Sequence, residues 1–363
     1  MTMPAGLASF TYTGHPARVV FGTGTLAAVR AEVERLGVTR ALVLTTPAQT
    51  AQGRAVLDRL GDRAAGLFDG AVMHTPVEVT RAALAVAGGL GADGLVAIGG
   101  GSTTGLGKAI AVRTRLPQVV IPTTYAGSEM TPILGETEGG QKTTRSSPDI
   151  LPETVIYDVE LTLGLPVALS GVSGINAIAH AVEALYARDT NPITQLMAEQ
   201  AIAALARALP AIATDPADRA ARTDALYGAW LSGVCLGAVG MALHHKLCHV
   251  LGGAFGLPHA ETHTAVLPYA VAYNAAAAPD AMARIAAALG RPGGDAGDAA
   301  AGLYDLAGAV GAARSLAAIG MPADGLDRAV DLALGNPYWN PRPLERAAIR
   351  DLLQRAFTGT RPT

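Results

Sequence analysis

Short apolar runs alternate with segments of helical spacing through the first 150 residues, and this alternation constrains the fold more than any other feature. Apolar runs without polar alternation are typical of strands buried on both faces. In chain order the predicted strands are Val19–Phe21, Ala41–Leu44, Gly70–His74, Leu95–Ile98 and Gln118–Ile121, and the predicted helices are Leu26–Leu36, Gly53–Leu60, Pro76–Leu90 and Thr104–Val112. Alternating strands and helices favour a parallel sheet covered by helices. We therefore predict an α/β N-terminal domain with a parallel, Rossmann-like sheet.

The strand pattern fades near Leu161, and long segments rich in alanine and leucine follow. Both residues are strong helix formers, and proline or glycine separates most of the segments. The predicted helical segments are Gly174–Ala187, Pro192–Ala213, Arg219–Leu243, Ala265–Leu289, Asp298–Ile319, Gly325–Ala333 and Leu344–Phe357. We therefore expect a dinucleotide-binding domain over residues 1–160 and an all-α catalytic domain over residues 161–363.

Composition argues against several classes of protein. The net charge is −3 and no basic block is present, so we expect no nucleic acid and no anionic membrane surface as partner. Two cysteines are too few for a disulfide framework, and residues 1–7 lack the pattern of a signal peptide. These features predict a cytoplasmic protein. The charge-free run Ala225–Leu243 is long enough to span a bilayer, but its glycines and its continuation into His244 favour a buried helix.

A glycine-rich turn follows the predicted strand Leu95–Ile98 and precedes a helix. Glycines let a backbone approach a phosphate closely, and a helix N-terminus offers free N–H groups and a positive dipole end. Ser102 could cap that helix or donate to a phosphate oxygen. Small hydroxyl residues follow the next strand, where carboxyl ends of parallel strands face a ligand. The predicted cofactor-binding residues of these two loops are Gly99, Gly100, Gly101, Ser102, Thr123 and Thr124.

Five of the eight histidines lie within one short segment, Met241–His263. His245 and His249 are four residues apart, so a helix places them on one face, and Asn176 and His180 form a second such pair upstream. A single histidine on an apolar helix is commonly just packed and hydrogen-bonded. Histidine is also the commonest group for proton transfer near neutral pH and the commonest metal ligand, so a convergence of several indicates a functional site.

Together these segments resemble the iron-containing alcohol dehydrogenase superfamily, also called group III. The resemblance spans nearly the whole chain and includes Gly99–Ser102 with Lys108, the stretch Asn176–Glu183, the histidine segment and Asn340–Pro343. It implies an N-terminal domain that binds NAD(P) and a helical domain that carries a divalent metal. The family's Asp-His-His-His metal ligands correspond to Asn176, His180, His245 and His259, and its additional active-site histidine corresponds to His249.

The sequence departs from the family pattern at Asn176, where the family has aspartate. A neutral amide is a poorer ligand for a cation than a carboxylate. Ala260–His263 replaces the family's Gly-x-x-Asn, and Gly105 replaces an aspartate of the phosphate loop. These departures resemble the branch of the superfamily that reduces the carbon–carbon double bond of maleylacetate to 3-oxoadipate with NADH or NADPH. The resemblance therefore implies an enzyme of aromatic-compound degradation that needs no metal.

In that branch we expect an enone dicarboxylate substrate and a homodimer. The predicted catalytic residues are His245 and His249, which stabilise the oxyanion and donate a proton, together with His180, His259 and Lys246. The predicted substrate contacts are Asn176, His263 and Arg342, and Thr46 stands where the family has the aspartate that binds the ribose. Alternatives are a metal-dependent alcohol or polyol dehydrogenase, a lyase similar to dehydroquinate synthase, and a non-enzymatic binding or membrane protein.

Overall fold

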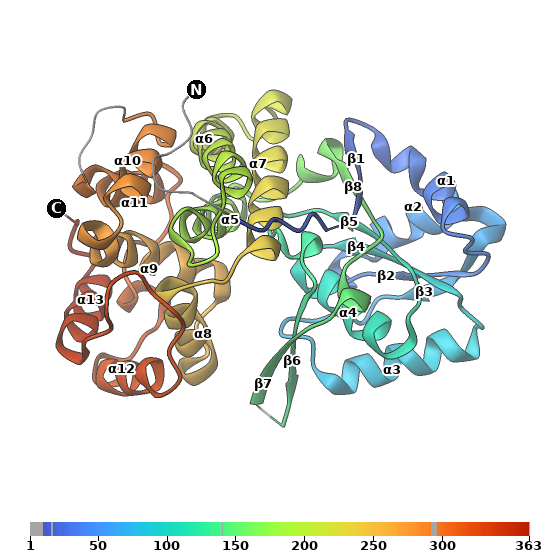
Figure 1. Ribbon diagram of the computed structural model, residues 1–363. Helices are drawn as coiled ribbons and strands as arrows, with labels where there is room; N and C mark the ends of the chain where they lie inside the picture. Colours follow the sequence, from blue (N-terminus) through green and yellow to red (C-terminus); the bar gives the residue numbers. More distant parts are fainter. Residues whose placement is uncertain (1–9, 16, 140, 292–295, 363) are drawn as a thin grey trace. The chain divides into compact units, whose positions relative to one another are not determined.

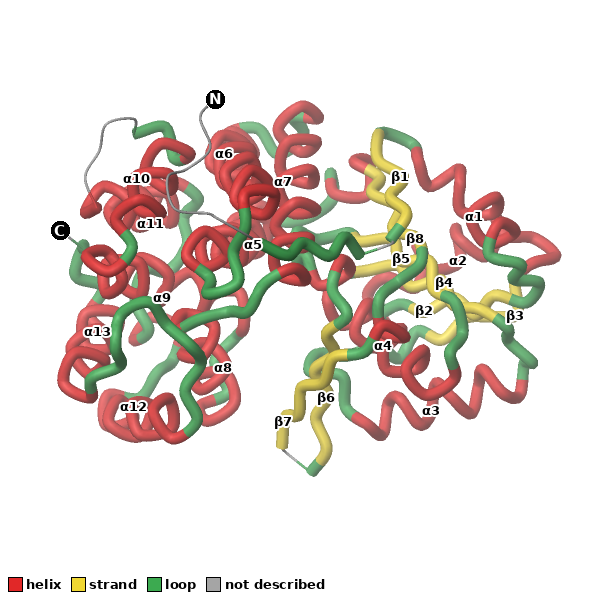
Figure 2. The backbone as a smooth tube through the Cα atoms, viewed as in Figure 1, coloured by secondary structure: helices red, strands yellow, loops and turns green. Residues whose placement is uncertain are grey.

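The computed structural model describes residues 10–15, 17–139, 141–291 and 296–362 (Figure 1, Figure 2). It divides into two compact units: His15–Leu165, and Pro166–Thr363 with the described residues before His15. The predicted domain boundary after residue 160 lies within the short 3-10 helix Val159–Thr162, and the assignment of a function to each domain stays a prediction. Residues 1–7, which lack the pattern of a signal peptide, lie outside the described residues.

A parallel six-stranded sheet forms the centre of the first unit, which confirms the predicted α/β fold (Figure 1). Apolar side chains fill β2, β4, β5 and β8 on both faces, so these strands carry no polar alternation. The strand order is β1-β8-β5-β4-β2-β3, and every neighbouring pair is parallel. The six strands are β1 Arg18–Gly22, β2 Ala41–Leu44, β3 Ala64–Phe68, β4 Gly94–Gly99, β5 Gln118–Pro122 and β8 Thr154–Asp158.

Two pairs of helices cover the two faces of this sheet (Figure 2). On one face, α1 (Val29–Arg35) and α2 (Thr50–Leu60) pack their apolar residues against β2, β4 and β5. On the other face, α3 (Val77–Gly89) and α4 (Gly101–Thr114) bury a second apolar cluster. The carboxyl ends of β2, β4 and β5 therefore share one edge of the sheet, and α4 begins directly at that edge.

The sequence-based prediction placed one strand wrongly and missed four strands of the described structure. Residues 70–74 form no strand; the edge strand is β3, a short apolar run, AAGLF, whose residues are only partly buried. A hairpin of β6 (Ile133–Glu138) and β7 (Gln141–Ser146) was missed because β7 carries only polar residues and half of the residues of β6 are polar. The buried strand β8 was also missed.

The second unit is helical, as predicted. The run Arg219–Leu243 is not one helix, because the chain leaves helical geometry between α7 and α8 at Val239–Ala242. α5 packs against α6, α7 and α9 near the centre of the unit, and 17 of its 20 residues are buried. The helices are α5 Val167–Tyr186, α6 Pro192–Thr214, α7 Arg219–Ala238, α8 Leu243–Phe255, α9 His259–Asn274, α10 Pro279–Ala288, α11 Ala296–Ala309, α12 Leu326–Gly335 and α13 Arg346–Thr358.

Two helices, α5 and α6, are long and apolar enough to cross a membrane by length and composition alone. α7 and α8 would pass the same test only as a pair, and they are bent by 96° at the break between them. In α5, 83% of the most apolar window is buried inside the fold, so this helix has the character of a core helix. The sequence had singled out Ala225–Leu243, and the break shows that this run cannot span a bilayer as one helix.

Candidate active site

The glycine-rich turn lies where the sequence predicts it, between β4 and α4. Gly99 has φ +151°, and a side chain there would also meet Gln49 Oε1 at 2.9 Å, so only glycine fits. Gly100 is the residue before the helix, and no side chain caps it. Ser102 lies inside the first turn, so its predicted role as a cap is wrong, while its hydroxyl remains a candidate phosphate donor. The uncapped N-terminus of α4 fits the phosphates of a dinucleotide.

Uncharged side chains link the loops at the carboxyl ends of β2 and β5. Gln49 donates from Nε2 to Thr123 Oγ1 at 2.9 Å, and its Oε1 accepts from Thr46 Oγ1 at 3.2 Å. The two predicted cofactor residues Thr46 and Thr123 therefore meet through Gln49, which the sequence analysis did not single out. Asp69, at the end of β3, accepts from Thr50 Oγ1 at 2.9 Å and is a carboxylate on the same side of the sheet.

Lys108 ties α4 to the loop that follows β5, although its side chain is almost completely buried. Its Nζ donates to the backbone oxygen of Ser128, to Thr131 O at 2.8 Å and to Ile133 O at 3.0 Å. Burial lowers the pKa of Lys108 to about 7, and the negative charge of the buried Glu129 opposes that shift. This network holds in place the loop that carries Thr123 and Thr124.

Replacing Lys108 with methionine should lower the free energy of unfolding by about 3 kcal/mol. The variant leaves buried carbonyl oxygens without a donor, and each such group costs about 1–3 kcal/mol. Chemical denaturation followed by circular dichroism measures the change. Arg115→Met, at the residue that directly follows this helix, is the control, since the Arg115 side chain is 83% exposed and should change stability by less than about 0.5 kcal/mol. Equal stability of the wild type and Lys108→Met would contradict a structural role for this lysine.

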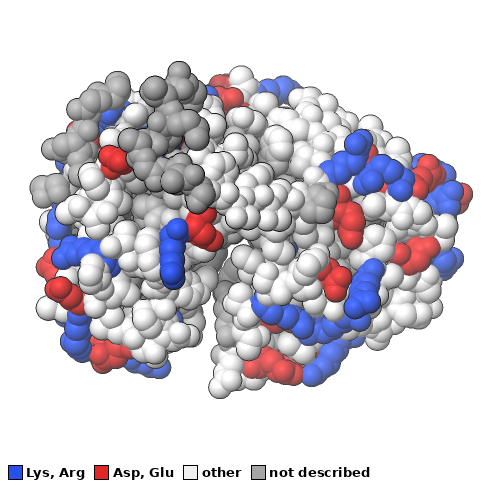
Figure 3. Space-filling model, in the orientation of Figure 1, with Lys and Arg blue, Asp and Glu red and all other residues white. Residues whose placement is uncertain are grey.

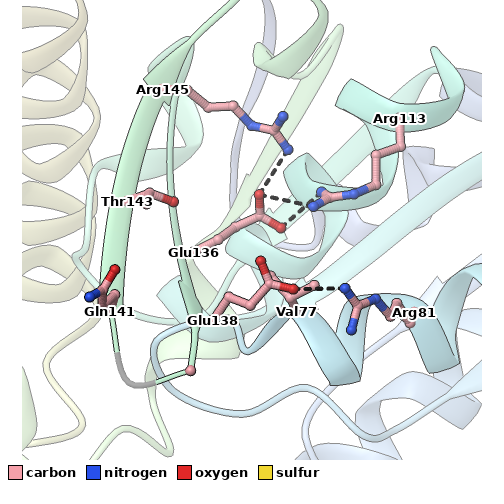
Figure 4. Close-up of a pocket in the computed structure, with 9 residues that line it drawn as sticks. Val77, Arg81, Arg113, Glu136, Glu138, Gln141, Thr143 and Arg145 are labelled. Carbon is pink, nitrogen blue, oxygen red and sulfur yellow. Dashed lines mark hydrogen bonds and ion pairs between the residues drawn. The ribbon is translucent and has the colours of Figure 1, made fainter.

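A separate pocket of about 550 Å³ lies in the same unit, beside the β6–β7 hairpin (Figure 4). Glu136 accepts from Arg113 and from Arg145, each at 2.8 Å, and Glu138 pairs with Arg81 at 2.7 Å. These ion pairs join the hairpin to α3 and α4. No predicted site residue lines the pocket. We therefore regard it as a structural feature of the hairpin and not as part of the candidate active site.

In the helical unit, α5, α8 and α9 bring together four of the predicted side chains. Asn176 and His180 lie one turn apart on α5, His245 lies in the first turn of α8, and His263 lies on α9; all four are buried. The ring centroids of His180 and His245 are 5.1 Å apart, and those of His245 and His263 are 4.9 Å apart. We call these four residues the histidine cluster.

Glu183 orients the histidine cluster from α5, and the sequence analysis gave it no role. Its carboxylate is completely buried and accepts from the backbone N–H groups of Ala242 and His244, each at 2.7 Å. It also lies 2.7 Å from His245 Nδ1. An acidic group at a helix N-terminus is stabilising, so Glu183 both anchors the start of α8 and fixes the ring of His245.

Four polar atoms of the histidine cluster have no hydrogen-bond partner among the described residues: Asn176 Oδ1, His180 Nδ1, His245 Nε2 and His263 Nε2. Buried polar atoms normally have partners, so a group of orphaned ones indicates a place where a polar ligand or water binds. Burial, reinforced by neighbouring histidines, holds the pKa values of His180 and His263 well below the usual range. These two rings are therefore neutral at physiological pH.

The remaining predicted residues lie around the histidine cluster or apart from it. His249 is partly exposed, and its Nδ1 is 3.1 Å from the hydroxyl of Tyr338, a residue that the sequence analysis missed. Lys246 is also partly exposed, with its Nζ 5.6 Å from the centre of the Tyr338 ring. His259 is exposed at the start of α9, where its ring centroid lies 4.4 Å from that of His263.

Arg342 is not brought to the histidine cluster. Its guanidinium lies 4.1 Å from the centre of the Tyr273 ring and donates to Tyr273 O at 3.1 Å. Tyr273 is ten residues beyond His263 on α9, roughly 15 Å along the helix axis. The role of Arg342 as a substrate contact stays a prediction.

An α/β unit whose glycine-rich turn opens an uncapped helix, and a helical unit with a histidine cluster, indicate a nucleotide-dependent oxidoreductase of the group III architecture. Residues 16–159 match the model of the iron-containing alcohol dehydrogenases, and residues 171–357 match the C-terminal model of the same family. The chain belongs to the iron-containing alcohol dehydrogenase family, which confirms the resemblance.

Relatives in this family include close matches over nearly the full length. The maleylacetate reductase of Rhizobium sp. is 60% identical over 353 residues, which are 97% of this chain and 99% of that protein. A crystal structure of maleylacetate reductase from Agrobacterium tumefaciens has a TM-score of 0.93 at 59% identity and covers 98% of this chain and 99% of its own. An iron-containing alcohol dehydrogenase from Corynebacterium glutamicum has a TM-score of 0.91 at 44% identity, with coverage of 97% and 98%.

The family name implies iron, but the residues at the corresponding positions fit a divalent metal poorly. Asn176 contributes a neutral amide oxygen, and the nearby carboxylate of Glu183 already accepts three hydrogen bonds. Among the described residues, one group of His, Cys, Asp and Glu has ligand atoms within 4.8 Å of one another, and it does not include His180, His245 or His259. A buried cation at these three histidines would therefore lack both a compact donor set and an anionic ligand.

Proposed function

We propose that this chain reduces the carbon–carbon double bond of maleylacetate to give 3-oxoadipate in the breakdown of aromatic compounds, with NADH or NADPH as the donor. The observation that carries the proposal is the full-length identity of 60% and 57% to two maleylacetate reductases. The neutral donor set around Asn176 supports it against a metal-dependent alcohol or polyol dehydrogenase. An alcohol dehydrogenase stabilises a full alkoxide with a metal, whereas a delocalised enolate needs only hydrogen-bond donors or a cationic side chain.

His245 is the residue best placed to stabilise the enolate oxygen. Because the carboxylate of Glu183 accepts from Nδ1, that nitrogen carries a proton in both charge states of the ring. Nε2 then donates only from the imidazolium, whose positive charge Glu183 balances. His249 donates the proton that completes the reaction, and its hydrogen bond with Tyr338 sets the orientation of its ring. His180 lines the site as a buried neutral ring, and His259 lines it as an exposed ring.

When bound, the nicotinamide cofactor supplies the hydride for the alkene carbon β to the ketone. The N-terminus of α4 and the loop held by Lys108 bind its phosphates and orient it. Lys246 pairs with one carboxylate of the substrate, and Asn176 and His263 are the further proposed substrate contacts. Partial burial lowers the pKa of Lys246, and an anionic substrate restores the preference for its charged form.

The test of the proposed function is the oxidation of NADH by the purified protein with maleylacetate. We expect turnover that depends on both compounds and forms 3-oxoadipate. Turnover with simple alcohols or polyols, and none with maleylacetate, would replace the proposal with the alternative dehydrogenase function.

Activity should survive exhaustive treatment with a chelator such as EDTA, with kcat within about twofold of the untreated enzyme. The physical reason is that Asn176 and neutral imidazoles take the place of a charged ligand set. Metal content measured by mass spectrometry alongside kcat checks the result. Loss of most activity, restored by iron or zinc, would show that the reaction needs a metal.

The enzyme should use NADH well and NADPH within about tenfold, a difference of only ~1.4 kcal/mol. Thr46 and Gln49 are neutral, so neither charge repulsion nor charge attraction at these positions selects a 2′-phosphate. Thr46→Asp should widen the preference for NADH. The measurement is kcat/KM for both cofactors in both proteins.

The Asp69→Asn variant is the matched control, because it removes the neighbouring carboxylate at the end of β3. If the wild type prefers one cofactor by more than about a hundredfold, a residue other than Thr46 binds the ribose. A preference for NADH that Asp69→Asn abolishes would identify Asp69 as that residue.

The proposal also includes a cytoplasmic homodimer without a nucleic-acid or membrane partner. Acidic and basic side chains are interspersed on the face of the molecule in Figure 3, in keeping with the net charge of −3. Light scattering coupled to size-exclusion chromatography tests the dimer through its mass, about twice that of the 36.8 kDa chain.

A further inference from the structure

The two ring nitrogens of His263 face different surroundings. While Nε2 is one of the orphaned atoms, Nδ1 lies 2.9 Å from His244 Nε2. Cys248, one turn further along α8, places its Sγ 3.7 Å from the same His244 Nε2. His244, Cys248 and His263 are each at most 1% exposed, and their ligand atoms all lie within 4.8 Å of one another.

Two of these separations are close to those between ligands on one tetrahedral ion. Zinc–nitrogen bonds of about 2.0–2.1 Å and a zinc–sulfur bond of about 2.3 Å put two nitrogens about 3.3 Å apart, and sulfur about 3.6 Å from each nitrogen. The observed distances are 2.9 Å between the nitrogens and 3.7 Å between sulfur and His244 Nε2. The nitrogens need to separate by only a few tenths of an ångström, and an imidazole–cysteine donor set suits soft or borderline cations.

The surrounding charges also suit a divalent cation. Burial, reinforced by neighbouring histidines, keeps the pKa values of His244 and His263 well below the usual range, so both rings are neutral and can act as ligands. A divalent ion and the Cys248 thiolate together carry one net positive charge. Glu183, which accepts the backbone N–H of His244, lies beside them, and its negative charge, which also faces His245, offsets part of this positive charge.

We infer that His244, Cys248 and His263 form a binding site for zinc or another thiophilic divalent cation, with a small exogenous ligand in the fourth position. Binding forms the metal–sulfur bond and releases the thiol proton to solvent. This site shares no residue with the family positions Asn176, His180, His245 and His259. The site shares His263 with the proposed substrate contacts, but the inference does not depend on the proposed reduction of maleylacetate, which needs no ion, and its test uses no substrate.

Cobalt(II) is the probe, because a cobalt–thiolate bond gives a charge-transfer absorption band and a tetrahedral cobalt ion gives intense visible bands. We expect the chelator-treated wild type to bind one cobalt ion per chain with both features, and zinc to displace it. Cys248→Ser should lose the charge-transfer band and bind cobalt at least about a hundredfold more weakly, since even outer-shell changes weaken metal binding by about 10–100-fold.

Cys235→Ser is the matched control. Cys235 is also buried in the helical unit, but its sulfur lies near a backbone oxygen, Thr194 O at 3.7 Å. This variant should keep the band unchanged, which assigns it to Cys248 even if Cys248→Ser does not fold. The absence of a thiolate band in the wild type would overturn the inference, as would its loss in Cys235→Ser or its survival in folded Cys248→Ser.

Discussion

Replacing His245 or His249 with alanine is expected to lower kcat for maleylacetate reduction by about two to four orders of magnitude. A positioned acid–base group commonly contributes about 10²–10⁴-fold. The Nε2 atom of His245 is buried and has no partner among the described residues, while Glu183 holds the ring through its other nitrogen. Tyr338 orients the ring of His249. Steady-state kinetics at saturating NADH measure the change, and circular dichroism shows whether each variant is folded.

His15→Ala is the control for these two variants, because His15 lies in the other unit and outside the histidine segment. Its kcat should stay within about twofold of the wild type. The double variant should lose little more than the weaker single variant, since residues that act as a unit are not additive. Wild-type kcat in both single variants would mean that these histidines serve only packing and hydrogen bonding.

The parts of the fold that could be predicted from sequence are those that burial dictates. β2 lies where Ala41–Leu44 was predicted, because a strand covered on both faces tolerates only apolar residues. The hairpin of β6 and β7 escaped prediction because β7 carries only polar residues and half of the residues of β6 are polar. α4 begins three residues before the predicted start, because Gly101, one of the glycines that suggested a loop, is its first residue.

The sequence could identify the site residues that occupy the metal-ligand positions of the family. It could not identify contacts between side chains that only the tertiary fold brings together. Asn176, His180 and Glu183 follow an i, i+4, i+7 pattern on α5, and that pattern could have identified Glu183 as a member of the same helical face. Tyr338 gave no such signal, since it lies 89 residues from His249. The hydrogen bond between His244 and His263 also depends on the packing of α8 against α9.

Glu183→Gln is expected to lower kcat by about ten- to thousandfold while the KM for NADH changes little. The carboxylate oxygen that faces His245 Nδ1 also accepts from Ala242 N, and the other oxygen accepts from His244 N. A glutamine amide cannot accept at both places, so either orientation sets its N–H₂ group against a backbone N–H. The substitution also removes the negative charge that balances the imidazolium of His245. An amide in place of a carboxylate behind a catalytic histidine can cost about 10⁴ in kcat.

The same variant should also lose stability, because one buried backbone donor is left unsatisfied at a cost of about 1–3 kcal/mol. Glu136→Gln separates this general effect from catalysis. Glu136 is a buried carboxylate that accepts from Arg113 and Arg145 in the other unit (Figure 4), so its replacement should lower stability and leave kcat within about twofold. If Glu183→Gln lost stability to the same degree but kept wild-type kcat, Glu183 would only anchor α8, and the orientation of His245 would have to come from the packing of α5, α8 and α9.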